Sequence, residues 1–351
     1  MSGKTRVLIV DDSAIVRKLL TEALSAERDI EVVGTAPDPY VARDKILTLK
    51  PDVLTLDIEM PRMDGVTFLR KLMRYHPMPV IVISSLGEAS CEAAVTALRE
   101  GAVEVIAKPG GPYSVGDLRI GLPAKVRAAA RAQVRLREAS EPLPARPAKA
   151  HPRPVDERTL IAIGASTGGT EAIEAVLTRL PARVPPIAVV QHIPAGFSRA
   201  FAERLNRVCE FEVREAADGD ALTPGLALVA PGNYHMLVNR AGSEYRVTIK
   251  DGPLVCYQRP SVDVMFHSAA KAAGAHGVGV ILTGMGSDGA QGLLAMKQAG
   301  AATIAQDEQT SVVFGMPREA IRLGAADRVL PLARVASGIM AAIEKPVAAR
   351  A

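Results

Sequence analysis

Short apolar runs that alternate with amphipathic helical segments constrain the fold of this chain more than any other feature of its sequence. In the first part of the chain the apolar runs are residues 7–10, 32–33, 53–56, 80–83 and 103–107. Five strands that alternate with helices predict a parallel, doubly wound sheet. In such sheets functional residues gather beyond the carboxyl ends of the strands.

Charged and hydroxyl side chains stand at the ends of these runs. Asp11 and Asp12 follow the first run, Asp57 the third, Ser84 the fourth and Lys108 the fifth. Three carboxylates at one rim repel each other unless a cation lies among them, and such oxygen ligands suit Mg²⁺. Asp57 is then a candidate nucleophile that forms an acyl phosphate, with Lys108 and Ser84 at the phosphoryl oxygens. An acid after a strand is often a helix N-cap, as Asp12 could be, but the whole set favours a site.

A proline-rich stretch separates these runs from a second alternating region. From Val126 the sequence is rich in Ala and Arg and could extend the preceding helix as a solvated arm, and five prolines follow in residues 141–154. Prolines at this density exclude a regular helix and predict an extended, semi-rigid spacer. We therefore expect a first domain at residues 1–125, a linker at 126–157 and a second domain at 158–345.

The second domain again alternates strand-like runs with helical patterns. Two runs that flank a turn, residues 236–238 and 245–249, predict a β-hairpin inside this alternation. The other strand-like runs are residues 160–163, 187–190, 211–213, 226–229, 278–282 and 302–305. The expected fold class is therefore α/β in two domains: an N-terminal (βα)5 doubly wound sheet, and a C-terminal parallel sheet with a β-hairpin insert.

A glycine turn with a central serine follows the first strand of the second domain. Residues 164–168 read GASTG, which fits the Gly-x-Ser-x-Gly nucleophile pattern. The predicted strand, turn and helix place Ser166 beside a helix N-terminus, where free N–H groups favour negative charge. A serine in such a turn is often a helix N-cap, however. A dinucleotide-binding turn would require different glycine spacing.

Two further polar residues end strands of the same predicted sheet. His192 and Asp288 would share a rim with Ser166, so that Ser166 could attack, His192 accept its proton and Asp288 orient the imidazole. The glycines around Met285 leave backbone N–H groups open, which makes the Met285 amide a candidate oxyanion donor. Each residue has an alternative, because His192 could be a loop histidine, Asp288 could cap the helix that follows it, and His235 competes as a histidine near the site.

Composition argues against several classes of protein. The 351 residues have 48% hydrophobic content, and the net charge of +4 forms no basic stripe, so we expect no nucleic-acid surface. The three distant cysteines predict neither disulfides nor zinc and fit a reducing cytoplasm. We see no signal peptide and no run as long as a membrane span, so we expect a cytoplasmic protein without membrane insertion, by default a monomer.

The first domain resembles the receiver domains of bacterial response regulators. The motifs that carry this resemblance are Asp11-Asp12-Ser13, residues 57–65 (DIEMPRMDG), Ser84 and Lys108-Pro109. The resemblance implies that Asp57 is the phosphoacceptor and that Asp11 and Asp12 hold Mg²⁺ with it, with the Glu59 carbonyl as a further ligand. It also implies that Lys108 pairs with the phosphoryl group and that the donor is a phosphohistidine on a partner histidine kinase.

The second domain is similar to the catalytic domain of the CheB family of chemotaxis protein-glutamate methylesterases. The shared motifs are residues 164–169 (GASTGG), 191–194 (QHIP), 230–232 (APG) with His235, 259–263 (RPSVD) and 283–289 (TGMGSDG). A receiver joined through a linker to this domain is the architecture of the family. The resemblance implies a phosphorylation-activated serine hydrolase, without a cofactor in the catalytic domain, that demethylates glutamate γ-methyl esters and deamidates glutamines on methyl-accepting chemoreceptors.

Two questions of function stay open on the residues alone. The second domain could be a binding module whose glycine turn holds an anion at a helix N-terminus. A receiver could also carry a DNA-binding output, but no helix-turn-helix with a basic recognition helix is apparent. If the receiver covers the rim that carries Ser166, phosphorylation of Asp57 would loosen it, and deleting residues 1–140 should raise the activity.

Overall fold

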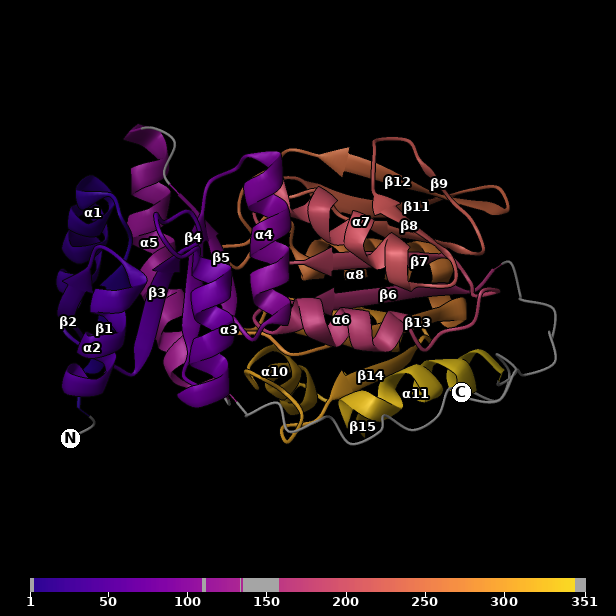
Figure 1. Cartoon of the computed structure of the whole chain (residues 1–351). Coiled ribbons are helices and arrows are strands. Elements are labelled where there is room, and N and C mark those ends of the chain that lie inside the picture. Colours follow the sequence, from indigo (N-terminus) through magenta and orange to yellow (C-terminus); the bar gives the residue numbers. More distant parts are fainter. Residues whose placement is uncertain (1–2, 109–111, 133, 135–157, 345–351) are drawn as a thin grey trace. The chain divides into compact units, whose positions relative to one another are not determined.

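The computed structural model describes residues 3–108, 112–132, 134 and 158–344. The chain divides into two compact units, residues 1–139 and 140–351 (Figure 1). Both units are α/β with parallel sheets, which confirms the expected fold class. Much of the predicted linker, from residue 135 to 157, lies outside the described residues.

The first unit is built on a five-stranded parallel sheet with strand order β2-β1-β3-β4-β5. Its strands are β1 (Thr5–Val10), β2 (Ile30–Ala36), β3 (Val53–Asp57), β4 (Val80–Ser84) and β5 (Glu104–Ala107). Its helices are α1 (Ala14–Ser25), α2 (Pro39–Leu49), α3 (Gly65–Tyr75), α4 (Glu88–Arg99) and α5 (Pro112–Ala130). Helix α1 packs beside α5, and α3 beside α4. All five predicted strands are present.

The end of helix α5 differs from the solvated arm that its Ala- and Arg-rich sequence predicts. Val126, Ala128 and Ala129 are buried against the unit. Arg127 pairs with Asp29 at 2.7 Å and with Glu27 at 2.5 Å. The small alanines allow the helix to lie close to its neighbours, while the arginine reaches acids in the connection between α1 and β2. This stretch therefore belongs to the packed first unit as far as Ala130.

The second unit is built on a seven-stranded parallel sheet with strand order β15-β14-β13-β6-β7-β10-β8. Its strands are β6 (Leu160–Ala165), β7 (Ile187–Gln191), β8 (Glu212–Glu215), β10 (Leu226–Val229), β13 (Gly277–Ile281), β14 (Ala302–Gln306) and β15 (Arg328–Leu330). Six of these strands match predicted runs. Strand β15 was not predicted because its three residues are partly exposed at the edge of the sheet and show no apolar run.

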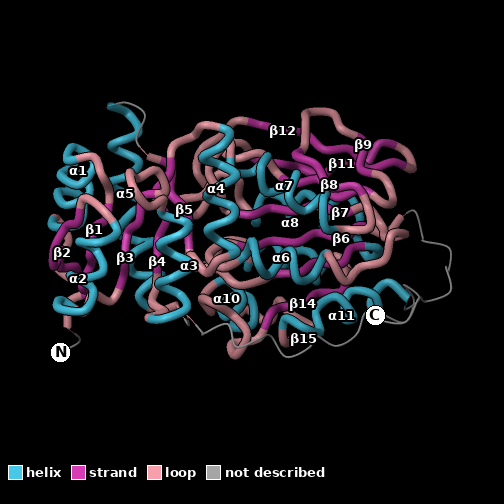
Figure 2. Tube along the Cα trace, viewed as in Figure 1, coloured by secondary structure: helices cyan, strands magenta, loops and turns pink. Residues whose placement is uncertain are grey.

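The predicted hairpin is present as β11 (His235–Ala241) and β12 (Glu244–Lys250). A third strand, β9 (Ala221–Leu222), pairs with β12 to give a small antiparallel sheet (Figure 2). Two residues are too short a run to show a strand pattern in the sequence. The hairpin packs on helix α8 (Val262–Ala273), which in turn lies near the carboxyl end of β6.

The helices of the second unit form two layers. The remaining helices are α6 (Gly169–Leu177), α7 (Phe197–Val208), α9 (Ala290–Gln298), α10 (Met316–Arg322) and α11 (Leu332–Glu344). Helix α6 contacts α7 and α11, while α9 contacts α8 and α10. Among the described residues, none of the helices combines the length and apolar character needed to cross a membrane.

The position of β6 determines where a site can form. The chain continues from β6 to β7 on one side, and β13 pairs with β6 on the other side. The strand order therefore reverses at β6, and ligands of open α/β sheets bind at such switch points. The carboxyl ends of β6, β7 and β13 carry all three predicted catalytic residues.

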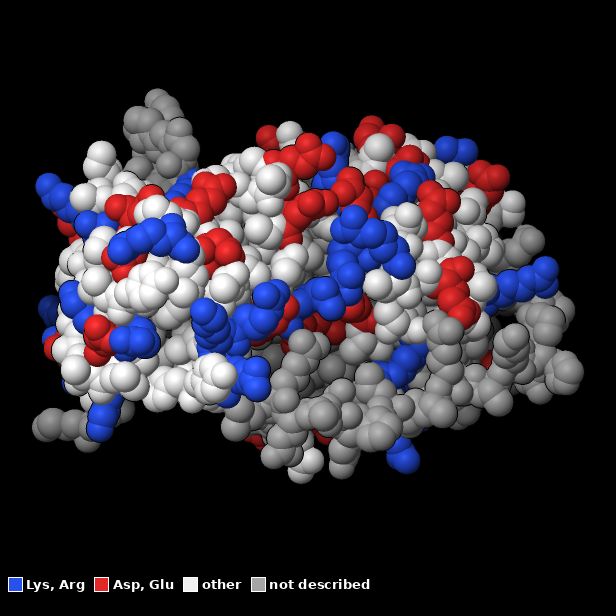
Figure 3. Space-filling view, viewed as in Figure 1, with Lys and Arg blue, Asp and Glu red and all other residues white. Residues whose placement is uncertain are grey.

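Acidic and basic side chains are mixed on the surface. On the face drawn in Figure 3, Lys and Arg lie among Asp and Glu. Several of these charges are paired, for example Arg43 with Asp44 at 2.9 Å and Arg70 with Glu100 at 3.0 Å. Exposed pairs of this kind contribute little to stability, so the fold depends mainly on its apolar cores.

Candidate functional site

Ser166 directly follows β6 and is held by its backbone to both neighbouring strands. Its N–H donates to the Thr283 carbonyl at 3.0 Å, and its own carbonyl accepts from Gln191 Nε2 at 2.8 Å. The N-cap of α6 is Gly168, with φ of 75°, and makes no side-chain capping bond. The N-cap interpretation of Ser166 is therefore wrong. The buried Ser166 is free to serve a different purpose.

A glycine next to this turn allows the serine to be held so tightly. A Cβ atom on Gly169 would lie 2.1 Å from Gln191 Oε1, so a larger residue would displace the glutamine that binds the Ser166 carbonyl. The glycine pattern of residues 164–169 thus reflects close packing around the serine. Gln191 was not predicted as a site residue, although it stands beside His192 in one of the motifs.

His192 and Asp288 meet at the same rim. His192 follows β7, and its N–H donates to the carbonyl of Ala165, the residue before Ser166, at 3.1 Å. His192 Nε2 and Asp288 Oδ2 are 2.7 Å apart, and both side chains are almost completely buried. The structure therefore brings together the three residues that the sequence predicts to share one rim.

Asp288 is surrounded by hydrogen-bond donors. Besides His192, its carboxylate accepts from Ser261 Oγ at 2.7 Å, from the Val262 N–H at 2.7 Å and from the Asp263 N–H at 3.1 Å. Burial raises the pKa of Asp288, but the bonds from His192, Ser261 and Val262 outweigh it, so the pKa is lowered from its ordinary value. The N-terminus of α8 thus keeps this acid ionised.

The alternative role of Asp288, as cap of the helix that follows it, is wrong. Helix α9 has Gly289 as its N-cap, without a side-chain capping bond. Asp288 instead bonds the first free N–H groups of α8, a helix that is distant in sequence. A capping pattern in the sequence cannot reveal such a contact, because the partner residues are brought together only by the fold.

The Asp288 bond determines which histidine nitrogen is available for proton transfer. Because Asp288 accepts from Nε2–H, the neutral ring of His192 carries its lone pair on Nδ1. His192 Nδ1 is buried, and no described residue donates a hydrogen bond to it. Within the described chain, Ser166 Oγ does not bond to Nδ1 either, so proton transfer between these two atoms stays a prediction.

The loop after β13 passes directly against Ser166. A Cβ atom on Gly284 would lie 2.7 Å from Ser166 Cβ, so only glycine allows this approach. The Gly284 carbonyl accepts from the Gly315 and Met316 N–H groups at 3.0 and 2.8 Å, which holds the loop in place. The Met285 amide comes next and donates to no described residue. Its role as oxyanion donor stays a prediction.

His235 supports the site without taking part in proton transfer. His235 Nε2 lies 2.9 Å from the Pro253 carbonyl, and the Ser261 N–H donates to His235 Nδ1 at 3.2 Å. Both ring nitrogens are thus engaged by the backbone. His235 positions Ser261, which binds Asp288. Ser261 was missed as a functional residue, although a serine before the helical pattern of residues 262–273 is a signal for an N-cap.

The predicted receiver residues meet at the carboxyl rim of the first sheet. Lys108 Nζ lies 2.7 Å from Asp57 Oδ2 and 3.3 Å from Asp11 Oδ2. The N-cap of α1 is Ser13, which accepts from the Val16 N–H, so the N-cap interpretation of Asp12 is wrong. Asp12 is exposed.

Three carboxylates crowd this rim, as the sequence predicts. Asp11, Asp12 and Asp57 each offer an oxygen within 4.8 Å of the others. Burial raises the pKa of Asp57 to about 6 against the opposing Lys108 charge, and the Asp11 carboxylate adds to the rise. An all-oxygen donor set with an excess of negative charge fits a hard divalent cation such as Mg²⁺.

The side chains of two other predicted receiver residues, Ser84 and Glu59, bond to groups outside the carboxylate cluster. The Ser84 hydroxyl donates to the Ser90 carbonyl at 3.2 Å, so it faces α4, and its contact with a phosphoryl group stays a prediction. The Glu59 N–H donates to Asp57 Oδ1 at 3.1 Å, while its carboxylate accepts from Ser85 and Ser90. The Glu59 carbonyl as a metal ligand also stays a prediction.

Comparison with known families matches both units. Residues 161–339 match the CheB methylesterase family, and residues 7–115 match the response regulator receiver domain. The crystal structure of the Thermotoga maritima CheB methylesterase catalytic domain is 36% identical, covers 52% of this chain and 97% of that chain, and has a TM-score of 0.51.

Curated relatives match nearly the whole chain. A protein-glutamate methylesterase/protein-glutamine glutaminase of Syntrophus aciditrophicus is 57% identical over 340 residues, which are 96% of this chain and 99% of the relative. A protein of the same name from Salmonella typhimurium is 53% identical over 351 residues, with 99% of both chains covered. The similarity thus includes both units and the region between them.

Proposed function

We propose a function from the premise that this chain belongs to the CheB methylesterase family and carries a response regulator receiver domain. The chain is a protein-glutamate methylesterase and protein-glutamine glutaminase, regulated by phosphorylation. It hydrolyses glutamate γ-methyl esters with release of methanol, and it deamidates glutamines. The observation that carries the proposal is the buried 2.7 Å bond between His192 and Asp288 at the rim where Ser166 stands.

The proposed reaction uses the polar groups at this rim. Ser166 Oγ attacks the ester carbonyl while its proton passes to His192 Nδ1. Asp288 stabilises the imidazolium that forms, through the bond to Nε2. The Met285 N–H donates to the carbonyl oxygen as it becomes negative. His192 then protonates the departing methoxide, and methanol leaves.

The acyl-enzyme is hydrolysed by the same groups in reverse. A water molecule gives its proton to His192 Nδ1 and attacks the acyl carbon, and Ser166 leaves with the proton that His192 returns. Glutamate is the product. A glutamine substrate reaches the same acyl-enzyme with ammonia as the leaving group, so one site performs both reactions. These steps use side chains, backbone amides and water, without a cofactor in the catalytic domain.

The receiver supplies regulation through Asp57. Asp57 accepts a phosphoryl group from the phosphohistidine of a chemotaxis histidine kinase, and Lys108 pairs with the new negative charge. The side chains of Asp11, Asp12 and Asp57, with the Glu59 carbonyl, would hold Mg²⁺. When bound, this cation neutralises the crowded carboxylates and the phosphoryl oxygens. The Ser84 hydroxyl turns to the phosphoryl group once it is present.

The substrate and the mode of regulation complete the proposal. The esters belong to the cytoplasmic helices of methyl-accepting chemoreceptors, so the chain acts in the cytoplasm in chemotaxis adaptation, as a monomer. The first domain, expected to end at residue 125, runs through helix α5 to Ala130, and a linker joins it to the second domain at residues 158–345. The unphosphorylated receiver restricts access of a protein substrate to Ser166, and phosphorylation relieves this restriction.

Release of methanol from receptors with radiolabelled methyl esters tests the proposal. Wild type should release label, Ser166→Ala should release none, and a small phosphodonor should raise the release by wild type. If Ser166-dependent release ignores the phosphodonor, the regulatory part fails. If folded wild type releases no label but binds receptor, the catalytic domain is a binding module instead.

A further inference from the structure

Exposed apolar side chains gather beside the active site of the second unit. Large hydrophobic residues that are exposed in its described part are Tyr234 (47%), Leu254 (58%), Tyr257 (83%) and Val329 (46%). The backbone segments of the first three are close, because Leu254 and Tyr257 belong to one turn and Tyr234 precedes His235, whose Nε2 lies 2.9 Å from the Pro253 carbonyl. Val329 lies on the edge strand β15. Apolar surface concentrated in this way often marks a binding site.

Tyr257 stands at the tip of a strained turn. Val255 and Gln258 exchange two backbone hydrogen bonds, of 3.1 and 2.9 Å. The two residues between them, Cys256 and Tyr257, have φ angles of 50° and 62°. A two-residue turn with both φ values positive is the type I′ geometry, which normally takes Asn and Gly. Strain of this kind persists where the surroundings impose it, and it is common at ligand-binding positions.

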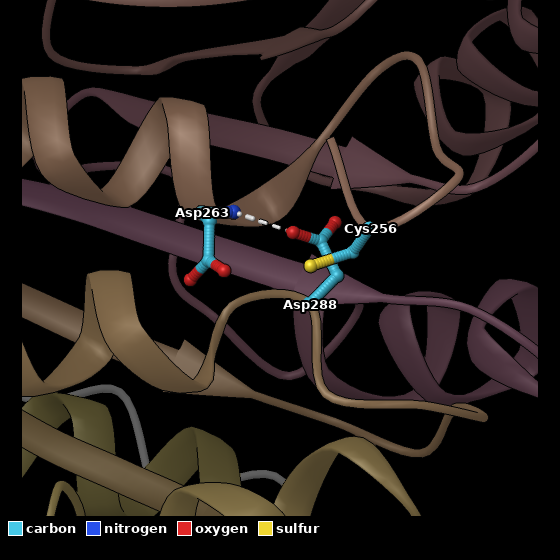
Figure 4. Close-up of side chains that lie close together, drawn as sticks. All are labelled: Cys256, Asp263 and Asp288. Carbon is cyan, nitrogen blue, oxygen red and sulfur yellow. Dashed lines mark hydrogen bonds between the residues drawn. The ribbon is translucent and has the colours of Figure 1, made fainter. Parts of the chain in front are cut away.

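The turn is fixed directly on the catalytic machinery. Cys256 Sγ and the carboxylate oxygens of Asp263 and Asp288 lie within 4.8 Å of one another, and Figure 4 shows the thiol beside the Asp288 carboxylate. At the base of the loop, Arg259 Nη1 bonds Asp251 Oδ1 and the Gly252 carbonyl, both at 2.5 Å. The turn that carries Tyr257 therefore lies beside Asp288.

Cys256, Asp263 and Asp288 are close enough to be metal ligands, but their other contacts argue against a metal site. All four positions around the Asp288 carboxylate are taken by Ser261 Oγ, His192 Nε2 and two N–H groups of α8. A cation could bind Asp288 only by breaking these bonds. The thiol also resists ionisation, because burial and the two nearby carboxylates raise the pKa of Cys256. The cluster shows how close the loop comes to Asp288.

We propose that residues 251–258 and Tyr234 form the surface that binds the protein segment around the modified glutamate, through aliphatic side chains of that segment. The proposal rests on the proposed function and specifies how a protein substrate is recognised. The one charged residue of the loop, Asp251, is exposed but is paired with Arg259 at the base of the loop, and the turn itself offers uncharged side chains, Leu254 and Tyr257, to the partner. A tyrosine side chain has only two torsion angles, so it loses little entropy when it is buried at an interface.

Truncation of Tyr257 tests this surface. Tyr257→Asn removes the ring but keeps the turn, because Asn tolerates positive φ. With methylated receptor as substrate, KM should rise about tenfold while kcat stays unchanged, the size expected for an interface aromatic. With a small chromogenic ester, which cannot reach the loop, both constants should equal those of wild type. Leu254→Ala should act in the same direction, and Val329→Ala, an equivalent truncation at the edge of the sheet, should have no effect.

Each outcome separates this inference from the proposed function. If wild type hydrolyses receptor esters and Tyr257→Asn has the same KM, the binding surface is wrong while the esterase stands. If the variant loses activity on receptor and small ester alike, the loop acts through the catalytic residues and the inference is also wrong. If wild type hydrolyses neither substrate, the proposed function fails.

Alkylation of Cys256 provides a second test that needs no turnover. Cys256 is an exposed residue, Cys91 is buried, and burial raises the pKa of Cys209 to about 12. Iodoacetamide should therefore modify Cys256 first. In Ser166→Ala, methylated receptor should slow this modification several-fold, and Tyr257→Asn should remove the protection. Equal rates with and without receptor would contradict binding at this loop.

Discussion

Asp57 and Asp288 occupy equivalent places in the two units and have opposite electrostatics. Each lies at the carboxyl rim of a parallel sheet, and each is almost fully buried. Yet the pKa of Asp57 is raised to about 6, whereas the pKa of Asp288 is lowered. Burial acts in the same direction on both groups. The difference must therefore come from their neighbours.

The neighbours determine what each carboxylate can do. Asp57 has Lys108 and one N–H as partners, but Asp11 repels it. The Asp288 carboxylate accepts four hydrogen bonds, so all four of its acceptor positions are occupied. A carboxylate that is short of donors can take a cation or a phosphoryl group. A carboxylate with every position filled can only orient its partner, which here is His192.

The largest expected effect comes from neutralising Asp288. Asp288→Asn places an NH2 group against donors from Ser261 and α8 and cannot hold His192 in the productive tautomer. Activity on a small ester should fall about 10⁴-fold, as for a triad acid replaced by its amide. Steady-state kinetics on purified variants measures this loss. Activity within tenfold of wild type would show that Asp288 does not orient the base.

The two units should respond to pH in opposite directions. Asp57 has a folded pKa of about 6 and an ordinary value of 3.8, so the folded state holds its proton more tightly, and stability falls as pH rises from about 4 to about 6. A difference of about two units corresponds to roughly 3 kcal/mol. The pKa of Asp288 is lowered, so its contribution is present above 3.8 and is lost as pH falls through the folded value.

Hydrogen exchange on the full chain can measure the pH dependence of stability in both units at once. After correction for the intrinsic exchange rate, protection of β3 should decrease between about pH 4 and 6, while protection of the β13 region should not. Asp57→Asn removes the titrating group and should flatten the slope in β3. If the pH dependence of β3 protection persists in this variant, it comes from Asp11, because burial also raises the pKa of that residue.

Much of this comparison could be predicted from the sequence, because both rims follow from apolar runs that end in polar residues. Asp57 is the last residue of a strand, and Ser166, His192, Asp288 and Lys108 each lie beyond the end of one. The surroundings of each carboxylate could not be predicted. They depend on contacts between distant segments, such as the N-terminus of α8 against the loop after β13.

The local alternatives show the same limit. Asp12 and Asp288 both stand where a helix cap is expected, yet Ser13 caps α1 and Gly289 precedes α9. Sequence patterns detect that a polar residue lies near a helix start. They do not tell which helix it bonds, nor that Nε2 of His192 faces the acid.

Mg²⁺ should stabilise the first unit, through the carboxylates around Asp57, and should leave the second unit unchanged. At pH 7, where Asp57 is ionised, Mg²⁺ at 100 times its Kd should stabilise the receiver by about 2.7 kcal/mol. Protection of β3 against hydrogen exchange should rise, and protection of β6 and β13 should not change. Asp12→Asn, an exposed substitution, should weaken the response without unfolding the sheet. An equal response at both rims would refute a dedicated site in the receiver.

The smallest expected effect comes from removing one donor of Asp288. Ser261→Ala deletes the bond from Oγ and the N-cap of α8, so stability should fall by about 1 kcal/mol. Asp288 keeps three donors, and kcat should fall by less than about tenfold. With one donor fewer, Asp288 attracts the imidazolium of His192 more strongly, so the acid limb of the kcat/KM profile should move to higher pH. Ser261→Thr keeps the hydroxyl, so its acid limb should return to the wild-type pH. If the acid limb of Ser261→Ala stays at the wild-type pH while stability falls, Ser261 acts only as a helix cap.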